Sequence, residues 1–424
     1  MAIDPPATIA VLGAGPIGLE AALYGRFLGY TVDVYERSTV GANLLEVGHV
    51  RLFSPFHMNS STLGLAALQS QDPAWRAPEP ERLLLARELV TAYLSPLAAS
   101  DLLAESLHEY TTVTAVGRQG LLKGEQIGDL SRGDRPFLLL LRDRAGDERT
   151  SMAQVVIDAT GTYGNPNSLG DGGIPAIGEV AAHDRIDHGL PDILGGARGI
   201  YAGAHTLVVG AGYSAATNVA ALAQLAGETD GAQITWVTRN KTADGDTGPI
   251  ARISDDRLPE RDRVAQAANA LTGGGCPNLR HFGGTVVSRL EAGGARVQVH
   301  LIGEHEGAIE VDRILANVGF RPDERLLGEL QVHLCYATGG PMKLAAALLG
   351  ETSADCLDQS GRGTSALSNP EPNLYVLGAK SYGRNSKFLI SVGLEQVRDV
   401  YTMITGRGDL NLYGAIRTAG SPTD

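Results

Sequence analysis

Two glycine-rich segments have residue types and a spacing that suit contact with a pyrophosphate. The first segment supplies Gly13, Gly15, Pro16, Ile17 and Gly18. The second supplies Gly210, Gly212, Tyr213, Ser214 and Ala215, with alanine in place of the third glycine. Glycines at this spacing allow a tight turn and let backbone N–H groups approach phosphate oxygens at the start of a helix. Each segment is therefore predicted to bind a dinucleotide.

The side chains that follow the two segments differ in charge. Glu36 follows the first segment, whereas Arg239 and Lys241 follow the second. A carboxylate accepts hydrogen bonds from ribose hydroxyls and repels a 2′-phosphate, whereas arginine pairs with phosphate oxygens through its planar fork. We expect NADPH at the second segment; a solvated basic turn beside an NADH site is the alternative. Two different dinucleotides in one chain indicate electron transfer from one to the other.

Short apolar runs around each segment predict the strands and helices that position these residues. Around the first segment, strands are expected at 8–12 and 31–35 and a helix at 16–28. Around the second, strands are expected at 206–209 and 233–237 and a helix at 213–225. Strand, glycine turn, helix and strand in this order form a Rossmann-like unit. The predicted fold class is α/β, with two Rossmann-like dinucleotide-binding domains.

Composition and charge argue against several other classes of function. The 424 residues are 43% hydrophobic, and the formal net charge is −13. An acidic chain without a long basic tract does not favour nucleic acid as a partner. No apolar run reaches the length of a membrane span, and no residue spacing predicts a metal site. Three cysteines favour a reducing cytoplasm over a disulfide framework. A small molecule is the expected substrate, and assembly into a homo-oligomer stays open.

Four segments in order along the chain resemble the two-dinucleotide-binding-domain flavoproteins. That group includes flavin-containing and N-hydroxylating monooxygenases and relatives of thioredoxin reductase. The segments are the first glycine turn with Glu36, the end of an apolar strand at 158–161, and residues 315–322 and 374–378. The resemblance implies that an NAD(P)H-binding domain, residues 198–316, is inserted in an FAD-binding domain formed by residues 1–197 and 317–424.

The resemblance implies FAD and NADPH as cofactors, with NADH as the alternative to NADPH. Beyond the two glycine segments, the expected cofactor-binding residues are Glu36, Arg37, Arg51, Thr160, Gly161, Arg239, Lys241, Gly319, Gly378, Ala379, Lys380 and Phe388. One departure concerns the last flavin-binding strand, which in the family usually ends in Gly-Asp. Here Gly378, Ala379 and Lys380 follow that strand, so the contact with the ribityl chain is expected to differ.

Three side chains are candidate catalytic residues: Arg51, His57 and Lys380. Arg51 and His57 lie in residues 49–57, where the family's chain passes the flavin ring. Arg51 would balance negative charge on reduced flavin or bind an acidic substrate, or alternatively be a surface or carboxylate-paired arginine. His57 would donate a proton, or alternatively be satisfied by neighbouring backbone. Lys380 would hold the flavin, a phosphate or an anionic substrate, or alternatively belong to a solvated basic loop.

The resemblance implies a monooxygenase in which reduced flavin takes up O2 as a C4a-(hydro)peroxide and oxygenates a small molecule. The Gly-x-Gly-x-Ser-Ala form of the second segment and the lack of a Cys-x-x-Cys pair in the chain favour this hypothesis. The alternative is an NAD(P)H-dependent flavoprotein reductase of a disulfide, a quinone or a protein carrier, with Cys335 and Cys356 as candidate thiols. A non-catalytic, nucleotide-binding redox sensor is a third class.

Overall fold

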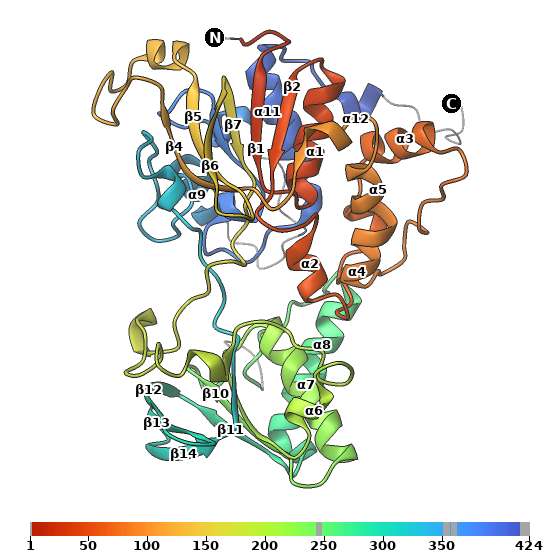
Figure 1. Cartoon of the computed structure of the whole chain (residues 1–424). Helices are drawn as coiled ribbons and strands as arrows, with labels where there is room; N and C mark the ends of the chain where they lie inside the picture. The colour runs from red at the N-terminus through yellow and green to blue at the C-terminus, as the bar shows by residue number, and fades with distance from the viewer. Residues whose placement is uncertain (1, 243–247, 351–356, 358–362, 416–424) are drawn as a thin grey trace. The chain divides into compact units, whose positions relative to one another are not determined.

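The computed structural model describes residues 2–242, 248–350, 357 and 363–415. The chain divides into two compact units (Figure 1). The first unit combines Met1–Asn165 with Arg321–Asp424, and the second is Pro166–Phe320. The second unit is thus inserted in the sequence of the first, and both contain parallel sheets, which confirms the predicted α/β class.

The first boundary between the units differs from the expected one near residue 198. Residues 166–197 belong to the second unit because short strand contacts attach them to it. β8 (Ile186–Asp187) pairs in parallel with β15 (Arg313–Ala316). Gly170 and Ile177 form isolated bridges to β12 (Thr285–Ala292). Such short bridges have no strong hydrophobic period, so the sequence pattern did not reveal them.

The first unit is built on a five-stranded parallel sheet in the order β16-β7-β1-β2-β3. The strands are β1 (Thr8–Leu12), β2 (Thr31–Tyr35), β3 (Leu107–His108), β7 (Val155–Asp158) and β16 (Leu374–Val376). In the strand register, Leu12 is paired with Tyr35 on one side and with Asp158 on the other, and Asp158 is paired with Val376. The carboxyl ends of these four strands therefore meet at one edge, where ligands of open α/β sheets bind.

Helices cover this sheet, and a second sheet of three antiparallel strands lies in the same unit (Figure 1). The helices are α1 (Pro16–Phe27), α2 (Ala42–Glu46), α3 (Thr62–Gln71), α4 (Ala86–Leu89), α5 (Ser95–Ala98), α9 (Met342–Leu349), α10 (Thr364–Leu367), α11 (Ile390–Thr405) and α12 (Leu412–Ala415). The antiparallel strands are β4 (Thr112–Arg118), β5 (Phe137–Arg142) and β6 (Glu148–Ala153). Gly25 lets α11 approach α1 closely, because a Cβ there would lie 2.4 Å from the Tyr401 hydroxyl.

The second unit repeats the parallel arrangement with the order β11-β10-β9-β15-β8. Besides β8 and β15, its parallel strands are β9 (His205–Val209), β10 (Gln233–Thr238) and β11 (Leu279–Gly283). The helices are α6 (Arg198–Tyr201), α7 (Tyr213–Glu228) and α8 (Pro259–Ala270). An antiparallel sheet combines β12 with β13 (Val297–Gly303) and β14 (Gly307–Val311). Both sheets of this unit contribute residues to its hydrophobic cores.

Candidate functional site

The first glycine turn connects β1 to α1, and its three glycines differ in the space around them. Gly13 has φ +97°, and an added Cβ would lie 2.9 Å from the carbonyl oxygen of Ala159. A Cβ on Gly18 would lie 1.9 Å from the carbonyl oxygen of Gly13, so helix and turn pack too closely for any side chain. By contrast, no atom lies within 4 Å of a Cβ added to Gly15, the N-cap of α1. The turn therefore leaves open space beside the helix N-terminus, which fits a dinucleotide pyrophosphate.

Glu36 lies directly after β2 at the same edge of the sheet and is held by two backbone donors. The N–H of Ala14 donates to Oε2 at 2.8 Å, and the N–H of Ser38 donates to Oε1 at 2.8 Å. Each carboxylate oxygen accepts more than one hydrogen bond, so both can still accept from ribose hydroxyls. Arg37, the next residue, is exposed, and a Cβ on Gly164 would meet its guanidinium at 2.6 Å. This geometry suits a dinucleotide that has a free ribose 2′-hydroxyl.

The turn after β16 packs against the first glycine turn, although more than 350 residues separate them in the sequence. Gly378 has φ +69°, and a Cβ added there would lie 3.5 Å from Ile17. A Cβ on Gly393 of α11 would lie 2.3 Å from Ile17 and 2.8 Å from Phe388. Three expected cofactor-binding residues therefore meet at the carboxyl edge of the sheet: Ile17, Gly378 and Phe388. Gly393 of α11 lies beside them.

A buried glutamine fixes the turn after β16. Gln396 of α11 accepts from the N–H of Gly378 at 2.9 Å and donates to Ser381 Oγ at 3.0 Å. Ser381 in turn donates to the carbonyl oxygen of Gly378 at 2.7 Å. Gln396 is 3% exposed, so its amide serves the backbone and not the solvent. The sequence did not single out Ser381, because a serine after a strand carries no signal for such a contact.

Lys380 forms a buried ion pair with Asp158, which the sequence did not predict. Lys380 Nζ donates to Asp158 Oδ2 at 2.6 Å and to Thr160 Oγ1 at 3.2 Å. Asp158 Oδ1 accepts from the hydroxyl of Thr160 at 2.6 Å and from its N–H at 3.1 Å. Both charged side chains are 1% exposed. The lysine therefore ties the turn that contains Thr160 and Gly161 to the turn after β16, and its charge is matched by the protein's own carboxylate.

The other two candidate catalytic side chains lie on the protein surface. Arg51 is exposed and donates to the carbonyl oxygen of Leu83 at 2.8 Å. The His57 side chain is 49% exposed, and its Nδ1 lies 3.2 Å from the carbonyl oxygen of Pro80 and 3.3 Å from Glu81 Oε1. These contacts are the surface alternatives expected for such residues. The contacts link Arg51 and His57 to residues 80–83 and do not link either of them to Glu36, Thr160 or Lys380.

The second glycine turn connects β9 to α7 and repeats the geometry of the first. Gly210 has φ +128°, and a Cβ there would lie 2.2 Å from the carbonyl oxygen of Asn317. Gly212, the N-cap of α7, has open space around its Cβ position. Ala215 is fully buried, while Tyr213 and Ser214 at the start of the helix are partly exposed. Asn317 precedes Gly319 and accepts from Asn218 at 2.8 Å, which fixes the end of β15 beside the turn.

The strand register shows which residue of the second unit corresponds to Glu36. The N–H of Gly13 donates to the carbonyl oxygen of Tyr35, and the N–H of Gly210 donates to the carbonyl oxygen of Val237. Glu36 follows Tyr35 and Thr238 follows Val237, so a neutral threonine stands where the first unit has its carboxylate. Arg239 comes next; it is exposed and forms no ion pair within the part of the chain that the structure describes. A small neutral residue followed by arginine suits a 2′-phosphate.

A hydrogen-bond network fixes the turn that contains Arg239 and Lys241. The Thr238 hydroxyl donates to the carbonyl oxygen of Asn240 at 2.7 Å. Because a hydroxyl has one hydrogen, the contact of Thr238 Oγ1 with His281 Nε2 at 2.9 Å requires the imidazole to donate. Burial and the nearby His305 lower the pKa of His281, which favours the neutral form of its ring. Lys241 Nζ lies 3.0 Å from Glu304 Oε2 in an exposed ion pair.

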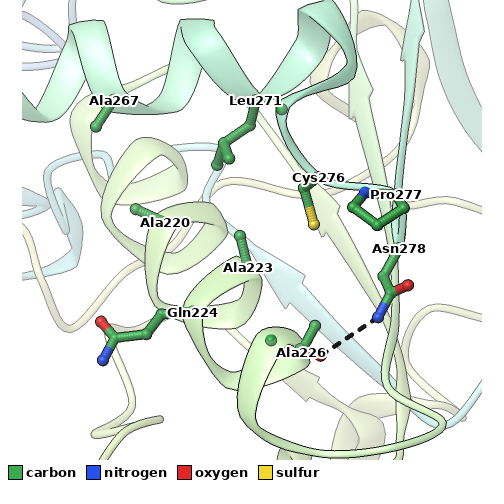
Figure 2. Close-up of a pocket in the computed structure, with 11 residues that line it drawn as sticks. Ala220, Ala223, Gln224, Ala226, Ala267, Leu271, Cys276, Pro277 and Asn278 are labelled. Carbon is green, nitrogen blue, oxygen red and sulfur yellow. Dashed lines mark hydrogen bonds between the residues drawn. The ribbon is translucent and has the colours of Figure 1, made fainter.

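The second unit contains a cavity of about 390 Å³. Figure 2 shows the residues that line it. Its lining begins at Ala220 on the later turns of α7 and continues through Leu271 and Cys276, near the end of α8. Its walls are mainly small apolar side chains, and Asn278 at its rim donates to the carbonyl oxygen of Ala226 at 3.4 Å. The motif residues 210–214 do not line it, so it is distinct from the candidate dinucleotide site.

The cysteines lie in different parts of the fold. Cys276 is in the second unit and Cys335 in the first; both are buried free thiols. Hydrogen bonds from the N–H and hydroxyl of Thr338 lower the pKa of the Cys335 thiol. The residues after Cys335 contact the turn that follows β16, because the N–H of Arg384 donates to the carbonyl oxygen of Thr338 at 2.8 Å. Cys356 lies outside the described residues.

No protein-family model and no curated protein sequence matches the chain. Among solved structures, the bacillithiol disulfide reductase Bdr (YpdA) from Bacillus cereus has a TM-score of 0.65 at 18% identity, over 95% of this chain and 99% of its own. DfoA, a cadaverine monooxygenase from Erwinia amylovora with FAD bound, has a TM-score of 0.61 at 14% identity, over 98% of each chain. Thioredoxin reductase from T. acidophilum has a TM-score of 0.57 at 14% identity, over 94% of this chain and 98% of its own.

These similarities confirm that the chain has the fold of two-dinucleotide-binding-domain flavoproteins. At such identities they establish the fold and not an activity, since related folds perform different reactions. Reductases and monooxygenases both occur among them, so the acceptor of the electrons is a separate question. None of the described helices has the length and apolar character needed to cross a bilayer.

Proposed function

We propose that this chain is an oxidoreductase that binds FAD in its first unit and NADPH in its second. The observation that carries this proposal is the contrast at equivalent strand ends. Glu36 follows β2 with both oxygens oriented by backbone N–H groups, whereas Thr238 and Arg239 follow β10. A carboxylate selects a ribose with a free 2′-hydroxyl, as in the adenosine of FAD, and arginine selects a 2′-phosphate. Shared fold with flavoproteins adds to this support.

The residues of the chain would bind and orient the cofactors. FAD, when bound, supplies the electron-transfer chemistry. The N-termini of α1 and α7 would stabilise the two pyrophosphates through their free N–H groups beside Gly15 and Gly212. The N-terminal turn of α11, which begins at Ile390 next to Phe388, would place backbone N–H groups near the flavin ring. The Lys380–Asp158 pair would hold the two turns beside the ring in a fixed position.

We further propose that the reduced enzyme passes its electrons to O2 and oxygenates a small molecule. Support comes from the sequence, which has no Cys-x-x-Cys pair through which a protein dithiol would carry electrons. In addition, Cys276 belongs to the second unit and Cys335 to the first, and each is a free thiol. Direct transfer from the cofactor to a diffusible acceptor is therefore the simplest path.

The test is rapid mixing of the NADPH-reduced holoenzyme with O2 while NADP⁺ is bound. A monooxygenase is expected to show a transient near-ultraviolet absorbance distinct from oxidised and reduced enzyme, with release of H2O2 slower than consumption of O2. Reoxidation in one step with simultaneous release of one H2O2 per O2, also in the presence of amine and sulfide substrates, would rule out oxygenation. NADPH oxidation without O2 but with a disulfide or quinone would identify a reductase instead.

A reductase of a small disulfide that works through a protein thiol is the second candidate, and one observation favours it. Hydrogen bonds from Thr338 favour the thiolate of Cys335, and a thiolate is the form that attacks a disulfide. The side chain is buried, at 3% exposed, so this role would require the residues after Cys335 to open. Turnover of a Cys335→Ser variant with disulfide substrates, compared with Cys276→Ser, separates thiol exchange from direct reduction at the cofactor.

A further inference from the structure

The 2′-phosphate region of the second unit contains an acidic residue that no dinucleotide motif includes. Glu304 lies between β13 and β14 and forms the ion pair with Lys241. Lys241 is one of the two cations expected to contact the 2′-phosphate of NADPH. A carboxylate beside that phosphate would repel it and would also occupy the ammonium group that should attract it. Glu304 is therefore placed to oppose the binding that Arg239 and Lys241 favour.

Backbone packing, and not chance contact of long side chains, brings Lys241 and Glu304 together. A Cβ on Gly283, at the end of β11, would lie 2.7 Å from the Cα of Lys241. A Cβ on Gly284 would lie 2.5 Å from Cγ of Glu304, and the N–H of Glu304 donates to the carbonyl oxygen of Gly284 at 3.0 Å. Two consecutive glycines thus allow close packing from both sides: the turn after β10 packs against Gly283, and the segment after β13 packs against Gly284.

Further hydrogen bonds and a ring contact lie beside the pair. The Thr238 hydroxyl and His281 fix the turn from one side. His305 stacks on Phe282 with ring centroids 4.4 Å apart, and its N–H donates to Thr285 Oγ1 at 3.3 Å. Among the residues of this region named here, Arg239, Lys241 and Glu304 carry fixed charges. Removal of Glu304 changes the net charge of these three side chains from one positive to two.

We infer that Glu304 is a specificity-determining residue that weakens the preference of the second unit for a 2′-phosphorylated dinucleotide. The inference rests on the proposed NADPH site. Glu304 neutralises Lys241, so the selectivity for the 2′-phosphate depends mainly on Arg239. Because the ion pair is exposed, it is worth little to the stability of the fold, and Glu304 can be replaced without disturbing the unit.

The experiment measures binding of two probes to the holoenzyme by calorimetry: adenosine 2′,5′-bisphosphate, which carries the 2′-phosphate, and 5′-AMP, which lacks it. Glu304→Gln is expected to tighten binding of the bisphosphate about five- to tenfold and to leave 5′-AMP within about twofold. Glu306→Gln is the matched control, since Glu306 is an exposed acid two residues away, and it should change neither value. In the Glu304→Gln background, Lys241→Gln should remove most of the gain.

Two results would overturn the inference. Weaker bisphosphate binding by Glu304→Gln would mean that Glu304 orients Lys241 toward the phosphate, and an equal change for both probes would mean a general effect. These results differ from failure of the proposed function itself. If the wild-type protein bound neither probe, the nucleotide site would be wrong, and the inference would fail with it. Steady-state KM values for NADPH and NADH then provide a second readout, with the NADPH value alone expected to fall in Glu304→Gln.

Discussion

Side-chain pairs that are far apart in the sequence determine the chemistry available at both candidate sites. Asp158 and Lys380 are 222 residues apart, yet they form a fully buried ion pair beside the turns that contain Thr160 and Gly378. Removal of one partner from such a pair leaves a buried charge without compensation, whereas joint replacement by neutral groups costs far less. In the second unit the Lys241–Glu304 pair is exposed and therefore contributes little to stability. We expect it to act on the binding of a charged ligand instead.

The buried pair gives a direct prediction at this scale. Lys380→Met should lower the free energy of unfolding by about 3–5 kcal/mol, because Asp158 then remains buried and unpaired. The double variant Lys380→Met/Asp158→Asn should recover a large part of this loss. Denaturant titration of the holoenzyme measures both values. Lys123→Met serves as the control, since Lys123 is exposed and its ammonium group donates to the carbonyl oxygen of Gly328. Equal small effects for Lys380 and Lys123 would contradict the structural role of the pair.

At the scale of elements, α1 combines the first dinucleotide turn with a buried ionisable group. Glu20, two residues after Gly18, is 2% exposed, and its Oε1 has no hydrogen-bond partner among the described residues. Burial raises the pKa of Glu20 from 4.5 to about 7, against weaker opposing effects of Ser61 and Tyr413. The same helix whose N-terminus follows the first glycine turn therefore has a carboxyl group whose charge depends on pH near neutrality.

The pH dependence of stability follows from this shift. The folded state holds the proton of Glu20 more tightly than the unfolded state, so stability falls as the pH rises from about 4.5 to 7. Glu20→Gln removes this loss and should raise the free energy of unfolding by about 3 kcal/mol at pH 8, with little change at pH 4.5. Denaturant midpoints at the two pH values measure the effect, with exposed Glu46→Gln as the control. A pH-independent difference between Glu20→Gln and wild type would contradict the assignment.

For the whole molecule, the insertion of one compact unit in the sequence of the other predicts that the two proposed binding sites can be disabled separately. Gly15 and Gly212 are the N-caps of α1 and α7, and each has open space where a Cβ would be added. Alanine at either position should therefore leave the unit folded and fill space needed by a pyrophosphate. Gly18 is different, since a Cβ there meets backbone at 1.9 Å and would disturb the fold itself.

We therefore expect Gly15→Ala to weaken FAD binding at least about tenfold, with the second unit still able to bind adenosine 2′,5′-bisphosphate. Gly212→Ala should raise the KM for NADPH by a similar factor and leave the flavin content unchanged. Gly117→Ala and Gly199→Ala are matched controls, because each adds a Cβ to open space away from the glycine turns. Flavin absorbance per protein and steady-state kinetics measure the two effects. Loss of both cofactors in either variant would argue against independent sites.

The sequence by itself determined the two glycine turns, their flanking strands and helices, and the α/β class. These features depend on local spacing, because a strand, a turn and a helix within 30 residues leave a hydrophobic and glycine pattern that can be read directly. The sequence also showed that an acidic residue, Glu36, follows the first segment and a basic residue, Arg239, follows the second. The sequence also indicated Gly378 and Phe388 as site residues, through the strand at 374–378.

Only the tertiary structure decided how distant residues share one site. It aligned Thr238, and not Arg239, with Glu36, because strand register depends on hydrogen bonds between β9 and β10. It enclosed Lys380 with Asp158, and it brought Glu304 to Lys241 across the Gly283–Gly284 pair. Arg51 and His57 lie on the surface with residues 80–83 as partners. Such contacts depend on packing between segments that no local pattern connects, so the sequence specifies them only through the completed fold.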